Sequence, residues 1–62
     1  MTKAQAELFK RSADNKLVAT GEPKDIAKLY LNFDSSRRKD HYIEYQGKTY
    51  GKADDVKKLL SV

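Results

Sequence analysis

Residues 21–29 read GEPKDIAKL and residues 51–59 read GKADDVKKL, two stretches thirty positions apart that share one pattern. In each stretch an acidic residue lies four positions after the glycine, and an apolar residue, a lysine and a leucine follow at the same spacing. Both stretches read as short helices, and each follows a segment that can form a β-hairpin. Because repeats of about 20 to 50 residues usually reflect repeated structural units, the pattern predicts the order ββα-ββα.

The predicted fold class is therefore α+β, with a small antiparallel sheet of two hairpins and two short helices on one of its faces. The 62 residues make one small domain. Its two repeat-like halves, at about 6–33 and 40–62, are joined by a basic loop at 34–40 that has no apolar residue. This loop is expected to be a solvated connector.

The two helices have recognisable starts. Helix one is expected at about 23–32, because Pro23 suits a first turn in which its missing N–H needs no partner. Its apolar residues at i, i+3, i+4 and i+7 form one stripe: Ile26, Leu29, Tyr30 and Phe33. Helix two is expected to begin near Lys52, with Asp54 and Asp55 in its first turn. Its buried stripe is Val56, Leu59 and Leu60.

The second hairpin has the clearer sequence signal. Residues 41–45 and 48–51 flank the pair Gln46-Gly47, and glycine at the second turn position tolerates a positive φ. A two-residue turn puts these side chains on one face: Ile43, Tyr45, Lys48 and Tyr50. The opposite face then receives Tyr42, Glu44 and Thr49.

The first twelve residues are compatible with two structures. Residues 2–5 resemble a capping box and residues 4–11 are rich in helix formers, which favours a helix. Residues 8–12 and 17–20 around Ala13-Asp14-Asn15 have the order strand, turn, strand. The repeat favours the hairpin.

The composition indicates a basic protein without the usual catalytic or metal-binding groups. Thirteen Lys and Arg residues against nine Asp and Glu give a charge of +4 and a pI near 9.4, which favours polyanions but is also ordinary for solubility. With one histidine, no cysteine and no recognisable nucleophile context, the sequence predicts no enzyme, no metal and no cofactor. No apolar stretch could span a membrane or act as a signal, so a cytoplasmic location is expected.

Seven residues are candidates for contact with nucleic acid. Arg37, Arg38 and Lys39 place three cations together, and guanidinium groups suit phosphate oxygens. The second hairpin combines aromatic and cationic side chains that could stack on bases and neutralise a backbone: His41, Tyr42, Lys48 and Lys52. The alternative for the charge run is a hydrated surface, and for the tyrosines ordinary packing in strands.

The layout of residues 37–60, a basic run, a strand, a Gly-Lys turn, a strand and a helix, resembles the three-stranded arm-binding domains of phage and transposon integrases and the plant AP2 domains. Those domains insert a sheet into the DNA major groove, so the resemblance implies that this hairpin would contact DNA in the same way. The chain lacks the Trp and the denser Arg positions of the AP2 reading strands. Residues 17–28 also resemble short ββα modules of phage-type proteins. No family is assigned on these similarities.

The leading hypothesis is a small, basic, non-enzymatic accessory protein of phage or mobile-element type that associates with nucleic acid. The alternative is a protein-interaction module or inhibitor that binds a larger partner through the edge or the uncovered face of its sheet. A homodimer formed through that face is a third possibility.

Overall fold

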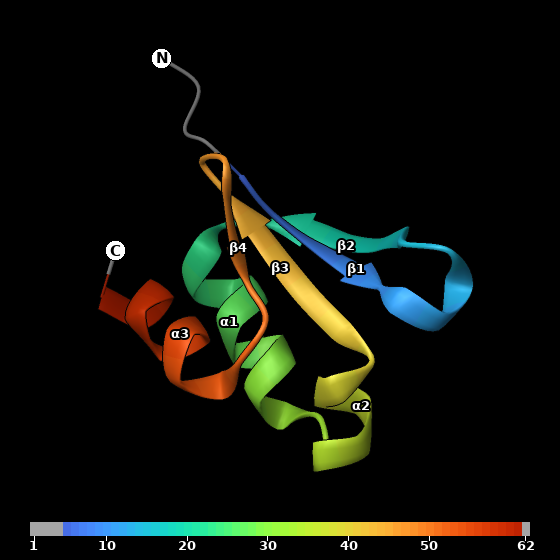
Figure 1. The fold of residues 1–62 in the computed structure, drawn as a ribbon. Coiled ribbons are helices and arrows are strands. Elements are labelled where there is room, and N and C mark those ends of the chain that lie inside the picture. The colour runs from blue at the N-terminus through green and yellow to red at the C-terminus, as the bar shows by residue number, and fades with distance from the viewer. Residues whose placement is uncertain (1–4, 62) are drawn as a thin grey trace.

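Four antiparallel strands form one sheet in the computed structural model, which describes residues 5–61 (Figure 1). Their order across the sheet is β2 (Lys16–Gly21), β1 (Ala6–Lys10), β3 (His41–Tyr45) and β4 (Lys48–Tyr50). Three helices pack against it: α1 (Pro23–Asn32), α2 (Ser35–Lys39) and α3 (Ala53–Lys57), the last continuing as the 3-10 turn η2 (Lys58–Ser61). The predicted α+β fold class is confirmed.

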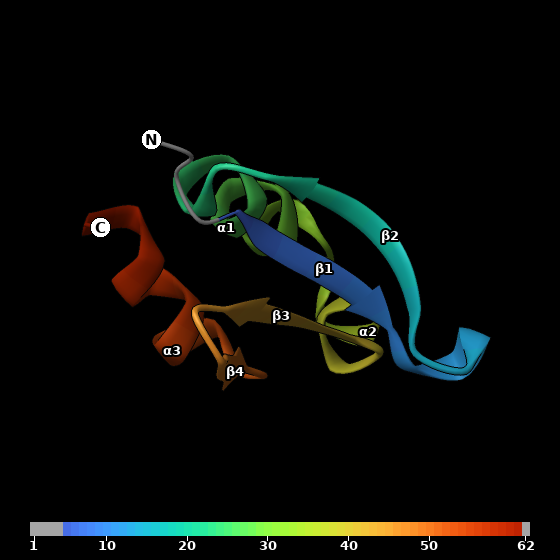
Figure 2. The ribbon, with the colours of Figure 1, turned by 90° about the horizontal axis from the view of Figure 1, so that it is seen from above.

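The first strands of the two hairpins pair with each other at the centre of the sheet. β1 and β3 run antiparallel, with Leu8 opposite Ile43, while β2 and β4 form the two edges. Figure 2 shows the strands from above in this order. The sheet therefore joins the two hairpins through long-range pairs, and each hairpin is followed in the chain by a helix.

The hydrophobic core lies on one face of the sheet. Along β1 and β3 buried and partly exposed residues alternate, as the two-residue period of a strand requires. Buried strand residues meet buried helix residues in one cluster: Ala6, Leu8, Ile26, Ala27, Tyr30, Ile43, Val56 and Leu59. Among residues 5–61 no helix packs on the other face of the sheet, which carries Phe9 and Tyr42 (Figure 1).

The ends of α1 agree with the prediction, but its buried stripe differs. Leu29, expected in the core, is 38% exposed, whereas Ala27 is fully buried. The reason is that α1 contacts α3 and η2 as well as the sheet, so its buried face is turned toward Ala27 and the partly buried Leu31. In the last helical segment Val56 and Leu59 are buried as predicted, and Leu60 is only partly buried.

The expectation of a connecting loop at 34–40 is wrong, because residues 35–39 form α2. The side chain of Asp34 accepts a hydrogen bond of 2.9 Å from the backbone N–H of Arg37 and caps the helix. The basic residues follow in its last turn, where cations interact favourably with the helix dipole. The segment is polar because α2 is largely exposed, not because it lacks regular structure.

Both hairpins are present. Residues 6–10 are strand, so the first hairpin is confirmed over the helix, and residues 2–4 of that alternative lie outside the described part of the chain. The 3-10 turn η1 (Arg11–Ala13) and two residues with φ of 59°, Asp14 and Asn15, connect β1 to β2. In β2 a bulge leaves Val18 without a partner in β1, because Leu8 pairs with Ala19 and Phe9 with Leu17.

The second hairpin has the predicted register. Ile43 lies opposite Tyr50 and Tyr45 opposite Lys48, across a turn in which Gln46 and Gly47 have φ of 51° and 80°. Residues 37–60 supply only two strands, and the third strand beside β3 is β1, from outside that stretch. The three-stranded layout implied by the integrase and AP2 resemblance is therefore not formed by this segment.

Within residues 5–61, no helix combines the length and the apolar character that a membrane span requires.

Candidate nucleic-acid interface

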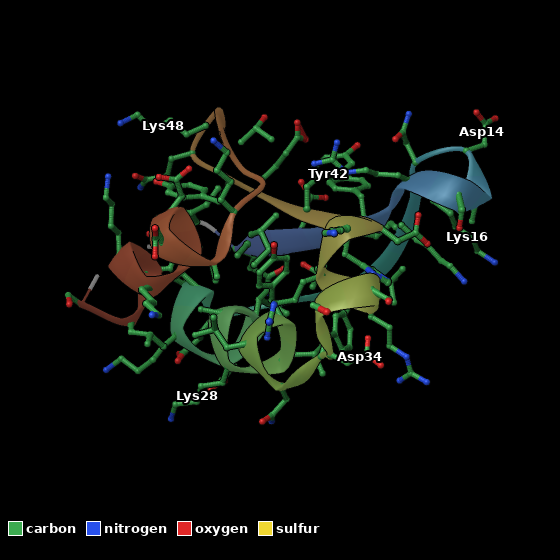
Figure 3. All side chains as sticks on the ribbon, turned by 60° about the horizontal axis from the view of Figure 1, so that its bottom comes forward. Asp14, Lys16, Lys28, Asp34, Tyr42 and Lys48 are labelled. Carbon is green, nitrogen blue, oxygen red and sulfur yellow. The ribbon has the colours of Figure 1, made fainter. Side chains whose placement is uncertain are left out.

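The seven predicted contact residues do not share one surface. Arg37, Arg38 and Lys39 belong to α2, which precedes β3, whereas Lys48 lies opposite Tyr45 at the far end of that strand. Lys52 precedes α3. Figure 3 shows Tyr42 and Lys48 on separate parts of the molecule. The cations of α2 and those of the second hairpin therefore cannot act as one compact patch.

Two of the three basic residues of α2 are free to meet a ligand. Arg38 is partly buried, and its Nη1 donates a hydrogen bond of 2.9 Å to the backbone carbonyl of Phe33, the residue that ends α1. Arg37 and Lys39 are exposed, and neither side chain makes a hydrogen bond or ion pair within residues 5–61. Arg38 joins α1 to α2, while the other two point their charge to solvent.

His41 lies inside the molecule. It is 6% exposed, its ring packs 4.7 Å from the ring of Phe33, and its Nδ1 lies 2.6 Å from the backbone carbonyl of Arg37. Because a carbonyl oxygen only accepts, the proton is on Nδ1, and in the neutral ring Nε2 is an acceptor. His41 thus holds α2 against β3, and only its Nε2 is left for a ligand.

Tyr42 lies on the uncovered face in an aromatic and cationic stack that the sequence did not suggest. Its ring stacks on Phe9 with centroids 5.2 Å apart and planes 19° apart. The guanidinium carbon of Arg11 lies 5.0 Å from the centroid of the Tyr42 ring. This guanidinium extends toward Gly51: if residue 51 carried a Cβ, that atom would lie 3.0 Å from Nη2 of Arg11. Phe9 lies in β1 and Arg11 begins η1 two residues later, and only the pairing of β1 with β3 brings both residues beside Tyr42.

The uncovered face is a poor surface for phosphate. Next to the row formed by Leu17, Phe9 and Tyr42 runs a second row across all four strands: Thr20, Glu7, Glu44 and Thr49. Glu7 and Glu44 are directly opposite each other, so two carboxylates lie beside the aromatic pair. Their negative charge disfavours a polyanion on this face.

Positive charge gathers instead at the end of the sheet beside α2. Lys10 lies opposite both Lys16 and His41, and the backbone N–H of Arg11 donates a hydrogen bond of 2.6 Å to the carbonyl of Asp40, just after α2. We call the cations of this region the basic end: Lys10, Arg11, Lys16, Arg37, Arg38 and Lys39. Figure 3 labels Lys16 and Asp14 in its hairpin and Asp34 at the start of α2.

The basic end holds most of the excess charge of the protein. Its six cations are accompanied by three carboxylates: Asp14, Asp34 and Asp40. The difference is +3, out of +4 for the whole chain. The rest of the molecule, including Lys48 and Lys52, is therefore nearly neutral.

A pocket of about 440 Å³ opens between α2 and the first hairpin, within the basic end. The bulged residue Val18 and Phe33 supply apolar walls, and Lys10 and Arg37 supply cations. The remaining lining residues are Ser36, Asp40 and His41. The pocket therefore combines apolar, cationic and hydrogen-bonding side chains.

Asp40 is the carboxylate that lines this pocket. The hydrogen bond from the Ser12 hydroxyl is the main cause that holds the pKa of Asp40 below its ordinary value. Desolvation raises the pKa, and the Ser12 N–H and the charges of Lys10 and His41 lower it further. Asp40 is therefore ionised at neutral pH and offsets one of the two cations at the pocket.

Residues 5–61 contain no group of three His, Cys, Asp or Glu side chains that could hold a metal ion. Comparisons of the chain with protein-family models, with curated proteins and with solved structures find no match.

Proposed function

We propose that this protein is a non-enzymatic accessory protein that binds the phosphate backbone of nucleic acid through its basic end. The observation that carries the proposal is the convergence of cations from β1, β2 and α2. The 2.6 Å hydrogen bond from Arg11 to Asp40 fastens the first hairpin to the end of α2. As a result Lys10, which lies opposite Lys16, lines the same pocket as Arg37, although Lys10 and Arg37 are 27 positions apart in the chain.

The number of free cations sets the expected strength of binding. Four side chains of the basic end make no hydrogen bond, ion pair or cation–π contact within residues 5–61: Lys10, Lys16, Arg37 and Lys39. Each phosphate neutralised on duplex DNA contributes about −0.9 to the slope of log affinity against log salt. Four contacts predict a slope of about −3 to −4 and an affinity in the range of non-specific binding, about 10⁻⁴ to 10⁻⁶ M at physiological salt.

Fluorescence anisotropy with a labelled duplex and a labelled single strand, titrated at several salt concentrations, tests this proposal. The test variant is Arg37→Ala/Lys39→Ala, and the matched control is Lys48→Ala/Lys52→Ala, which removes the same charge away from the basic end. We expect the test variant to bind several-fold more weakly and to lower the salt slope by about 2, with a smaller change in the control. Absence of binding at low salt, or equal losses in both variants, would overturn the proposal.

A protein partner bound at the edge strand β2 is the second candidate. Leu17 and Val18 are adjacent on this strand and are 45% and 50% exposed. An edge strand with exposed apolar side chains can pair with an extended segment of another protein. The variant Leu17→Lys separates the two functions, because the added cation should weaken an apolar contact and slightly strengthen nucleic-acid binding. If the role of the protein in cells is nucleic-acid binding, Leu17→Lys should still perform that role. Loss of the cellular role with nucleic-acid binding intact would favour the protein partner.

A further inference from the structure

We propose that the pocket of the basic end receives one unpaired nucleotide, so that the protein prefers single-stranded nucleic acid to duplex. This inference rests on the proposed function and specifies its substrate class. The pocket volume, about 440 Å³, lies within the range of about 300 to 1,000 Å³ typical of small-ligand sites.

His41 presents an unpartnered polar atom at the pocket. His41 is 6% exposed and lines the pocket, and its side chain makes one hydrogen bond among the described residues, through Nδ1. No buried side-chain nitrogen or oxygen in residues 5–61 lacks a partner. The Nε2 atom is therefore not sealed in the core but reaches open space, and the space that the ring borders is the pocket. In the neutral ring Nε2 accepts a hydrogen bond, as from the amino group of a nucleobase.

The walls of the pocket match the parts of a nucleotide. The apolar side chains of Val18 and Phe33 suit the flat face of a base, which stacks on apolar and aromatic groups. Lys10 and Arg37 line the same pocket and suit a phosphate. Free phosphate would use only the cations, and an apolar peptide would use only the apolar walls. A nucleotide uses both.

The charge balance at the pocket favours an anionic ligand. Lys10 and Arg37 outnumber the single carboxylate of Asp40. Both oxygens of that carboxylate already accept hydrogen bonds from Ser12, Oδ1 from the N–H and Oδ2 from the hydroxyl. The remaining electrostatic field favours a phosphate near the two cations.

The preference for single strands follows from the stacked state of bases in a duplex. A paired base has both faces and its Watson–Crick edge occupied, so it cannot enter a side pocket without being flipped out of the helix. An unpaired nucleotide has its base free. The backbone contacts of the basic end remain available to either form.

The experiment compares an unpaired oligonucleotide with a duplex of the same sequence by anisotropy at one salt concentration. Ser36→Met narrows the pocket without changing charge, and Ser35→Met is the matched control, since Ser35 is exposed on the same helix but does not line the pocket. We expect the wild-type protein and Ser35→Met to bind the single strand about fivefold more tightly or better. In Ser36→Met this preference should largely disappear.

NMR of the unmodified protein provides a readout that needs no variant. Adenosine monophosphate should shift the ring signals of His41 and Phe33, whereas inorganic phosphate at the same concentration should leave the Phe33 ring unchanged. Equal binding of single strand and duplex, or identical shifts with both probes, would overturn the proposal that the pocket receives a nucleotide while leaving the proposed function in place. Absence of binding to either nucleic acid would overturn both.

Discussion

The hydroxyl of Ser12 donates a hydrogen bond of 2.6 Å to Oδ2 of Asp40, and the backbone N–H of Ser12 donates one of 3.0 Å to Oδ1 of the same carboxylate. The pair joins the turn of the first hairpin to the residue between α2 and β3, 28 positions away in the chain. With the adjacent backbone bond from Arg11 to the carbonyl of Asp40, it fastens the two parts that make up the basic end.

The Ser12–Asp40 contact predicts a loss of stability in acid. Hydrogen bonding from Ser12 lowers the pKa of Asp40 below its ordinary value of 3.8, so the folded state binds the proton less readily than the unfolded chain. The stabilisation is present above the unfolded pKa and is lost as the pH falls through the folded pKa. Urea unfolding at neutral pH and at about pH 2.5 should show a smaller acid-induced loss for Asp40→Asn than for the wild-type protein. Equal losses would mean that this carboxylate does not contribute.

The two leucines at the C-terminal turn should differ in their effect on stability. Leu59 is 1% exposed within the core cluster, whereas Leu60 only packs against it. Truncating a buried leucine to alanine typically costs about 2–5 kcal/mol. A domain of this size has a total stability of about 3–9 kcal/mol. Leu59→Ala should therefore be largely unfolded in circular dichroism, and Leu60→Ala should remain folded with a lower melting temperature. Similar melting temperatures would contradict this assignment.

The turn of the second hairpin should respond in opposite directions to two substitutions. Gly47 has φ of 80°, which costs a residue with a side chain about 1–2 kcal/mol. Gln46 also has a positive φ, 51°, and asparagine tolerates that conformation better. Gly47→Ala should lower the free energy of unfolding by about 1 kcal/mol, and Gln46→Asn should raise it slightly. Thermal melts of both variants check this, and stabilisation by Gly47→Ala would contradict it.

The carboxylate pair on the uncovered face predicts a stabilising charge reversal. Glu7 and Glu44 lie directly opposite each other on β1 and β3, where like charges repel. Glu44→Lys should raise the free energy of unfolding by about 0.2–1 kcal/mol, and more at low salt, because the repulsion becomes an attraction. Glu44→Gln, which only removes the repulsion, is the control. A stability that falls in both variants would indicate another role for this row.

The phenol of Tyr30 predicts a sensitivity to alkaline pH. Tyr30 is 1% exposed, its hydroxyl donates to the carbonyl of Gly51 at 3.3 Å, and burial raises its pKa above 10.0 despite the nearby charges of Arg38 and Arg11. The folded state therefore keeps the neutral form, and stability is lost as the pH rises through the folded pKa. Tyr30→Phe should lose about 0.5–1.5 kcal/mol near neutral pH, since one hydrogen bond is removed, and should show a weaker alkaline loss. Urea unfolding of both proteins at neutral and at alkaline pH measures the two losses of stability.

Much of the secondary structure could be predicted from local patterns. Pro23 marks the start of α1, and Gln46-Gly47 determines the register of the second hairpin, because proline and glycine restrict or extend the backbone whatever surrounds them. The repeat at 21–29 and 51–59 correctly favoured a hairpin before each helix. The segment 34–40 has no apolar residue, which predicts a loop, whereas in the structure Asp34 caps the short exposed helix α2.

The candidate site could be predicted only in part. Arg37 and Lys39 are exposed as expected, but His41 is buried and Arg38 is bound to Phe33. Lys10 and Val18 line the pocket beside α2, and nothing in their local sequence connects them with Phe33 and Arg37 on its other side. They meet because β1 pairs with β3, a contact across more than 30 residues.

The sequence by itself determined the fold class, the turns and the strand alternation, since these depend on residues close together in the chain. The tertiary structure decided which cations share a surface, which face of α1 is buried, and that Nε2 of His41 has no hydrogen-bond partner among the described residues. The positions of the cations and of His41 depend on the pairing of β1 with β3 and on the Ser12–Asp40 contact. The buried face of α1 depends on its packing against α3 and η2. Long-range contacts of this kind are selected by the burial of the whole core, and no short segment encodes them.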